Sequence, residues 1–135
     1  MTLGINVTTR NAMLDAITAR AGGSALLRIY DGTRPATGGT PTNLLAQLTC
    51  NATFAPGASS GVLTLNSIAS ATSAVGTGAA KWFRIVSASP TFAHVLDGSV
   101  TTQLVGTGDL QLDSDSIVTG GTVAVSSASI TAANA

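Results

Sequence analysis

The apolar residues of this chain follow a helical spacing in one segment near the N-terminus and a strand-like spacing almost everywhere after it. From residue 9 to residue 21, apolar side chains recur every three or four positions. Thr8 or Thr9 can cap the start of this segment, and Gly22 and Gly23 supply the left-handed backbone that ends a helix. We therefore predict a short amphipathic helix over 9–21, docked on a sheet. Its apolar side consists of Met13, Leu14, Ile17 and Ala21, and its polar side of Arg10, Asn11, Asp15 and Arg20.

Seven later segments are rich in Val, Ile, Leu, Thr and aromatic residues, and several of them alternate with a period of two. The clearest alternation sets Leu110 and Leu112 against Gln111 and Asp113. Clusters of Gly, Pro, Ser and Thr separate the segments at spacings that suit a sandwich or barrel. The predicted strands cover residues 25–31, 43–52, 61–69, 79–88, 92–100, 109–114 and 122–132.

Together these elements predict an all-β fold with one short N-terminal helix, built as an antiparallel β-sandwich or a jelly roll. A chain of 135 residues suits one domain. The helix is expected to pack over a face or an end of the sheet. The predicted core consists of Leu27, Ile29, Leu45, Leu48, Val62, Leu65, Phe83, Ile85, Val95, Leu110, Leu112, Val123 and Val125.

The N-terminal residues 1–8 are predicted to form an arm ahead of the domain at 9–135. Leu3, Ile5 and Val7 alternate with Gly4 and Asn6, so an extended arm presents three apolar side chains on one face. Such an arm suits the addition of a strand to the edge of a neighbouring subunit. The same residues also fit a first strand of the domain.

The stretch "IYDGTRP" marks the end of a strand at a defined turn. Asp31 can bond the backbone just beyond itself, and Gly32 accepts a positive φ without a steric penalty. Pro35 cannot donate to a continuing ladder, so the chain is expected to leave the sheet here. We predict a structural turn at Asp31 and Gly32 that binds no ligand. Residues 68–80 are nearly all small, a composition that either packs closely against another backbone or forms a flexible loop, and a loop or a weak edge strand is favoured.

Charge is scarce, since only 9% of the residues are charged, with a net charge of zero. About a quarter is ordinary in a globular protein. A freely diffusing protein usually keeps more charge, so much of this surface is expected to meet other protein in an assembly. One lysine and five dispersed arginines argue against nucleic acid as a partner, because binding phosphates needs a clustered basic face.

Targeting segments and disulfides are not expected. The N-terminal sequence has no cationic segment followed by a long apolar one, and no run reaches the roughly 20 apolar residues of a membrane helix. We therefore expect synthesis in a cytoplasm and no membrane partner. Cys50 is the only cysteine, which excludes a disulfide scaffold and fits a small core residue better than a nucleophile.

No catalytic or cofactor-binding motif is apparent, so we expect no enzyme and no cofactor. His94 is the only histidine, and Asp97 follows it three positions later, a spacing that puts the two side chains on opposite faces of a strand. No nucleophile elbow supplies a serine partner. The glycine patterns "TGGT" and "GTGDL" do not lie between a strand and a helix, so they are interpreted as turns and not as phosphate-binding loops.

Two further groups suggest binding sites weakly. Asp109, Asp113 and Asp115 offer the oxygen ligands that Ca²⁺ prefers, but their spacing does not match the twelve-residue calcium loop, so solvated turn residues are expected. Trp82 and Phe83 suggest a stacking platform for bases or sugars. Adjacent strand residues diverge, so we expect one of this pair in the core and the other on the opposite face.

In order along the chain, "TRNAMLDAITARAGG", "LLRIYDGTRPAT", "KWFRIV", "VLDGSV" and "LQLDSDSIVTGGTVAVSS" resemble a family of small virion structural proteins of tailed bacteriophages and their prophages. The resemblance covers nearly the whole length, and none of these phrases is a catalytic motif. It implies a structural part of the virion. Small β-rich members of such sets are commonly cement or decoration proteins on the capsid, while others belong to the neck, tail or fibres.

This resemblance implies a protein made in the host bacterial cytoplasm and assembled on the capsid exterior. Its partners would be the major capsid protein and copies of itself, with the chain bridging capsomers as a dimer or trimer. From their alternation, Leu3, Ile5 and Val7 are the expected assembly contacts, together with the small-residue loops. A cement protein stabilises the shell by binding the assembled state. A host-directed carbohydrate-binding module is the other alternative, and it requires an exposed Trp82.

Overall fold

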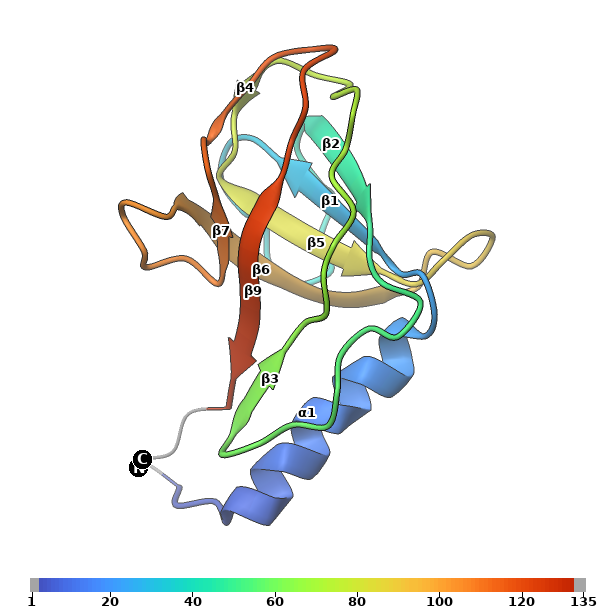
Figure 1. The fold of residues 1–135 in the computed structure, drawn as a ribbon, viewed down its shortest axis with the longest axis vertical. Coiled ribbons are helices and arrows are strands. Elements are labelled where there is room, and N and C mark those ends of the chain that lie inside the picture. Colours follow the sequence, from blue (N-terminus) through green and yellow to red (C-terminus); the bar gives the residue numbers. More distant parts are fainter. Residues whose placement is uncertain (1–2, 133–135) are drawn as a thin grey trace.

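The computed structural model describes residues 3–132 as one helix and nine strands (Figure 1). Residues 1–2 of the predicted arm and residues 133–135 of the predicted domain lie outside the described residues. All seven predicted strand segments contain a strand, so the all-β class with one N-terminal helix is confirmed. The elements are α1 (Val7–Ala21), β1 (Leu26–Tyr30), β2 (Leu44–Thr49), β3 (Val62–Thr64), β4 (Gly78–Ala79), β5 (Trp82–Val86), β6 (His94–Thr102), β7 (Leu110–Leu112), β8 (Ser116–Ile117) and β9 (Val125–Thr131).

Seven strands form one sheet in the order β2-β1-β5-β6-β7-β9-β3, and β4 pairs with β8 in a separate two-stranded sheet. All neighbours in the large sheet are antiparallel except β6 and β7, which are parallel. The prediction of a fully antiparallel arrangement is therefore wrong at this pair. The strand order is that of one continuous mixed sheet, so the two separate sheets of a sandwich or jelly roll are not confirmed.

The large sheet curls so that β9 passes across β1 and β5 (Figure 1). A small pocket of about 10 Å³ lies at this contact, lined by Leu27, Phe83 and Ile85 on one side and by Ala128 and Ile130 on the other. The main core fills the space inside the curl. Burial of these apolar side chains supplies the main favourable term for the fold.

Nine of the predicted core residues are buried: Leu27, Ile29, Leu45, Leu48, Phe83, Ile85, Leu110, Leu112 and Val123. Leu65, Val95 and Val125 are partly buried against them. At β3 the prediction was displaced by one residue, because Leu63 is fully buried while Val62 is half-buried. Since neighbouring strand residues point to opposite faces, a shift of one position exchanges the two sides.

Helix α1 begins at Val7, two residues before the predicted start. Asn6 is its N-cap, and the Asn6 side chain accepts a hydrogen bond of 2.8 Å from the backbone N–H of Thr8. The predicted caps Thr8 and Thr9 are therefore wrong, and Val7 belongs to the helix and not to an extended arm. The predicted end is confirmed, because Gly22 has a φ of +69° and its N–H bonds the carbonyl of Thr18.

The four side chains predicted to form the solvent side of α1 all bond the body of the protein, although only Arg10 and Asn11 are half-buried and Asp15 and Arg20 remain exposed. Each one bonds a main-chain group of another segment. Arg10 donates to Ala132 O at 3.1 Å, Asn11 accepts from Gly61 N at 2.9 Å, Asp15 accepts from Ala58 N at 2.8 Å, and Arg20 donates to His94 O at 3.3 Å. These bonds add to the burial of Leu14 and Ala21 in holding the helix in place.

Residues 68–80 run mostly as irregular chain, as predicted, with β4 at their end and a bridge between Ala71 and Val123. Their backbone protects the outer edge of β2, because Val75 N and Gly76 N both donate to Leu45 O. This contact closes an edge that would otherwise be open to other chains. Within residues 3–132, no helix has both the length and the apolar character needed to cross a membrane.

Candidate functional site

The most concentrated group of charged and aromatic side chains lies on the outer face of β1, β5 and β6, opposite the core. Arg84 of β5 and Asp97 of β6 are paired in register across the two strands. Their side chains form a two-pronged ion pair, with Arg84 Nε 2.7 Å from Asp97 Oδ1 and an Arg84 Nη 3.0 Å from Oδ2. Arg84 is 8% exposed, and the Asp97 side chain is 2% exposed. In a buried pair of this geometry, each charged group replaces the hydrogen bonds to water that the other group loses on burial.

Residues 32–42, which we call the covering loop, close over this ion pair. The same Arg84 nitrogen donates to Gly39 O at 2.9 Å, and Gly38 N donates to Asp97 Oδ2 at 3.1 Å. Gly39 is required at its position, since an added Cβ would lie 2.9 Å from Ala36 O. The ion pair therefore binds the loop through its backbone.

The base of the covering loop is held at the predicted turn. Gly32 has a φ of +68°, the conformation for which glycine was predicted. The Asp31 carboxylate was expected to bond the backbone just beyond it, but it accepts hydrogen bonds from Asn43 instead. The donors are the backbone and side-chain nitrogens of Asn43, at 3.1 and 3.2 Å. The Thr42 hydroxyl donates to Asp31 O. Asp31 thus holds the two ends of the covering loop together. The sequence around Asp31 did not predict this contact with Thr42 and Asn43.

Trp82 lies beneath the covering loop and is 1% exposed. Its ring stacks on Tyr30 with centroids 4.4 Å apart, and the Arg84 guanidinium lies 5.3 Å from its centroid. The indole N–H reaches both Asp31 O at 3.1 Å and Thr42 Oγ1 at 3.0 Å. Phe83 points into the core, so the expectation that the adjacent aromatic residues diverge is confirmed. Trp82 does not offer a stacking platform to an outside ligand.

The electrostatics of the site favour the charged forms of both partners. The hydrogen bond with Asp97 raises the pKa of Arg84 further, against the opposing effect of burial. Burial by itself would raise the pKa of Asp97. The hydrogen bonds from Arg84 and Gly38, together with the Arg84 charge, outweigh burial and bring that pKa below its usual value. The carboxylate is therefore held ionised, with its oxygens occupied by the guanidinium and the loop.

His94 lies beside this pair, with Nε2 3.2 Å from Asp97 Oδ1. The expectation that His94 and Asp97 point to opposite faces is wrong. The register of β5 and β6 shifts at this point, pairing Ile85 with Leu96 but Val86 with His94. This bulge inserts one extra residue, which brings positions three apart onto the same face.

The three aspartates of the "DLQLDSDS" segment do not gather into a site. Asp109 accepts hydrogen bonds of 3.1 Å from the backbone and the hydroxyl of Ser99. Across the described part of the chain, no group of three His, Cys, Asp or Glu side chains is placed to hold a metal ion. Cys50 is buried, and burial raises the pKa of its thiol to about 11. At neutral pH this thiol is protonated and behaves as a core residue.

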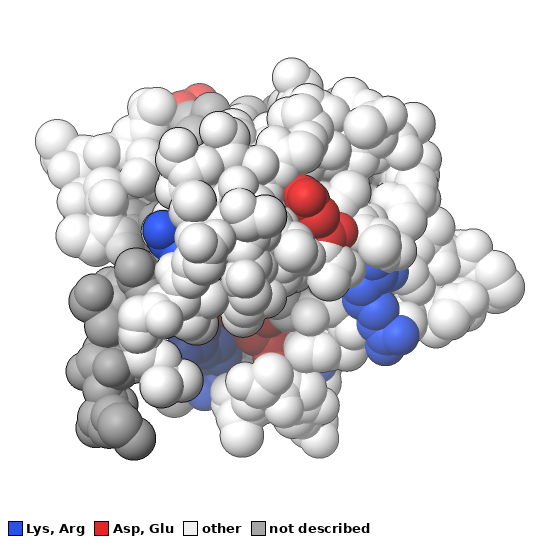
Figure 2. All heavy atoms as spheres, turned by 90° about the horizontal axis from the view of Figure 1, so that it is seen from below, with Lys and Arg blue, Asp and Glu red and all other residues white. Residues whose placement is uncertain are grey.

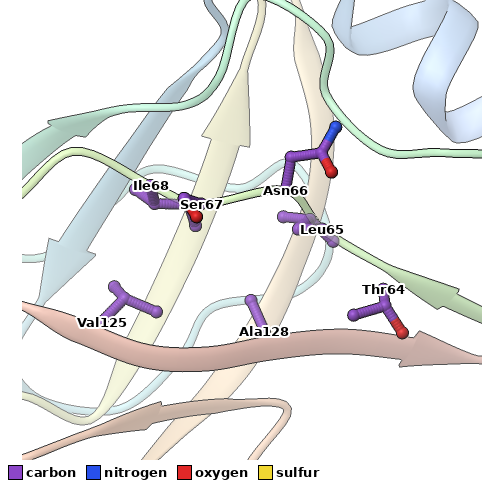
Figure 3. Close-up of a pocket in the computed structure, with 7 residues that line it drawn as sticks. All are labelled: Thr64, Leu65, Asn66, Ser67, Ile68, Val125 and Ala128. Carbon is purple, nitrogen blue, oxygen red and sulfur yellow. The ribbon is translucent and has the colours of Figure 1, made fainter.

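A groove of about 260 Å³ opens where the chain after β3 separates from β9 (Figure 3). Leu65 still bonds Ala128 through its N–H, but the backbone of residues 66–68 turns away from the strand. The lining is short and mixed, and it carries no charged side chain: Thr64, Leu65, Asn66, Ser67, Ile68, Val125 and Ala128. This groove lacks the converging polar groups that mark a small-molecule site.

Among the described residues, eight large apolar side chains are exposed, and six of them lie at three extremities of the molecule. Leu3 and Val7 lie at the start of α1, Val75 and Val118 lie beside the β4–β8 sheet, and Leu104 and Val105 lie in the loop after β6. In Figure 1 these places are the bottom, the top and the left side of the molecule. Leu104 is 97% exposed and Leu3 is 67% exposed. Of the predicted contact residues, Leu3 and Val7 are exposed and Ile5 is half-buried.

Comparison with known proteins gives no relative: no family model, no curated protein and no solved structure matches this chain.

Proposed function

We propose that this chain is a cement or decoration protein of a tailed bacteriophage, bound to the outside of the head as a bridge between capsomers. It is made in the host bacterial cytoplasm, and its partners are the major capsid protein and copies of itself. The observation that carries the proposal is the placement of exposed apolar side chains at three separate extremities of an almost uncharged surface. A protein that contacts several neighbours at once needs separated contact points of this kind.

The surrounding surface supports this role. In the view from below, acidic and basic groups are few and scattered among uncharged residues (Figure 2). Uncharged groups can be covered by another chain without the desolvation cost of buried lysines or aspartates. The resemblance of the quoted phrases to small virion proteins points in the same direction. The cluster of charged side chains at Arg84 and Asp97 is explained by its structural role, because it binds the covering loop.

The carbohydrate-binding alternative required an exposed Trp82, and Trp82 is buried. A neck, tail or fibre component remains the competing structural role, and copy number separates it from a cement protein. We expect purified particles to contain this chain in hundreds of copies, in a fixed ratio to the major capsid protein. A copy number of three, six or twelve, or labelling confined to the tail or neck, would contradict the capsid assignment.

The arm is tested by a point substitution in preference to a deletion. Deleting residues 1–7 would also remove the Asn6 cap and the Ile5 carbonyl, which accepts from Arg10 at 3.2 Å. Leu3→Asn removes only an exposed apolar side chain, and Leu3→Met is its matched control. We expect Leu3→Asn to reduce head occupancy at least about tenfold and Leu3→Met to retain it, with equal thermal stability. Full occupancy by Leu3→Asn would refute the arm as a contact.

A further inference from the structure

The side of α1 that points away from the sheet has no partner within the described residues. This outer face consists of Thr9, Ala12, Met13, Ala16 and Ala19, all of them exposed. In Figure 1 the helix lies along the lower edge of the molecule, with the described strands above it. Met13 is 53% exposed although the sequence predicts it as a docking residue.

The outer face of α1 differs from that of an ordinary surface helix, although Leu14 and Ala21 are buried on its inner side. A surface helix normally buries an apolar stripe and shows polar groups to water. Here Arg10 and Asn11 bond the main chain of the body, and the outer face holds alanine, threonine and methionine. This arrangement is expected of a helix whose outer face is covered by another chain.

The spacing of the outer face gives the geometry of that contact. Thr9, Ala12, Ala16 and Ala19 are separated by three, four and three residues, which is the a-d-a-d spacing of a heptad. In that register Asp15 occupies a g position and Arg20 the following e position. Both side chains are exposed, and each keeps one bond to the body, from Ala58 N to Asp15 Oδ1 and from Arg20 Nε to His94 O. Positions g and e are the ones that form salt bridges between paired helices.

The charges of Asp15 and Arg20 indicate which helix can pack here and whether it runs parallel or antiparallel to α1. In a parallel pair of identical helices, each g residue lies near the e residue five positions later in the other helix, so Asp15 faces Arg20 on both sides of the contact. An antiparallel two-fold pair would bring Asp15 beside Asp15 and Arg20 beside Arg20. The outer face is therefore complementary to a parallel copy of itself.

We infer that a second copy of this chain packs on the outer face of α1, parallel to it and related by a two-fold axis along the helices. Alanine at three of the four seam positions lets the two backbones approach closely. The sheets then lie on opposite sides of the helix pair, and both Leu3 side chains lie at the same end of the dimer. This inference rests on α1 alone and holds whether or not the chain belongs to a capsid.

The test uses the purified full chain without phage particles, so it is independent of the head-binding experiment. We expect sedimentation equilibrium to show a dimer, and Ala16→Arg to weaken dimerisation at least about tenfold while the thermal midpoint of the monomer is kept. Ala79→Arg places the same residue at an exposed alanine of β4, near the opposite end of the molecule (Figure 1), and should remain dimeric. A monomeric wild type, or equal effects of the two variants, would overturn the inference.

Cysteine crosslinking tests the direction of the pair. Ala12→Cys and Ala19→Cys, made separately, place thiols seven residues apart, or about 10 Å along the helix. In a parallel pair each variant meets its own copy, so both should form interchain disulfides under mild oxidation. The buried Cys50 makes the wild type the control, which should not crosslink. Crosslinking at one position only, or only between a mixture of the two variants, would overturn the parallel arrangement.

Discussion

Asp97 joins three parts of the molecule through one carboxylate. It pairs with Arg84 on the neighbouring strand, accepts the Gly38 N–H from the covering loop, and lies near His94 beyond the bulge. A buried charge without a partner destabilises the fold, whereas a buried ion pair is tolerated. Removing one partner therefore lowers the free energy of unfolding by more than the intact pair adds to it.

Replacing Asp97 with asparagine is therefore expected to leave the Arg84 charge buried without its partner. We predict that Asp97→Asn lowers the free energy of unfolding by about 3 kcal/mol, as measured by urea denaturation at pH 7. Asp109→Asn changes an exposed carboxylate and should have a smaller effect. Equal stability of the Asp97→Asn protein and the wild type would show that the ion pair contributes nothing to the fold.

The depressed pKa of Asp97 also fixes a pH dependence. A carboxyl group whose pKa is lower in the folded state contributes stability above its unfolded value of about 3.9, and loses that contribution as the pH falls through the folded value. The wild type should thus lose stability below about pH 4, and Asp97→Asn should lose less over the same range. Parallel stability curves for the two proteins between pH 5 and pH 2 would contradict this assignment.

At the scale of elements, the covering loop depends on one turn. Gly32 has a positive φ, which costs a non-glycine residue about 1–2 kcal/mol and a β-branched residue more. The space itself is adequate, since an added Cβ would lie 3.5 Å from the Thr42 side chain. The strain is therefore in the backbone and not in a clash.

We predict that Gly32→Val reduces the folded yield and the thermal midpoint, while Gly32→Asn, which tolerates this conformation, has a smaller effect. Soluble yield and thermal unfolding followed by circular dichroism measure both variants. A valine variant as stable as the wild type would mean that the loop closes without the turn.

Most strands were predictable because their segments are rich in Val, Ile, Leu, Thr and aromatic residues, and several of them alternate, most clearly Leu110 and Leu112 at β7. The direction of strand pairing could not be predicted, since nothing in the sequence of β6 or β7 indicates that these two strands pair in parallel. The meeting of His94 and Asp97 depends on a bulge set by the pairing of β5 and β6, which single-strand periodicity does not contain. The burial of Trp82 depends likewise on a loop that lies near it only in the folded chain.

At the scale of the whole molecule, scarce charge predicts how association responds to salt. Screening weakens contacts between exposed charges and leaves apolar contacts nearly unchanged. We predict that occupancy of phage heads changes less than about twofold when NaCl is raised from about 0.05 M to about 0.5 M. Sedimentation of decorated heads at each concentration measures it. A steep fall in occupancy would show that the head contact is electrostatic and that the apolar extremities do not carry it.

The bond between Arg10 and the carbonyl of Ala132 spans 122 residues, and β3 likewise has no partner until β9 is made. The ribosome produces α1 well before these partners, and contacts so far apart in the chain form slowly. A nascent chain that stops before residue 125 has neither the strand that completes the sheet nor the acceptor that seats the start of α1. Folding is therefore completed only after β9 and Ala132 have been made, and chains that terminate before them are excluded from any assembly that requires a correctly positioned α1.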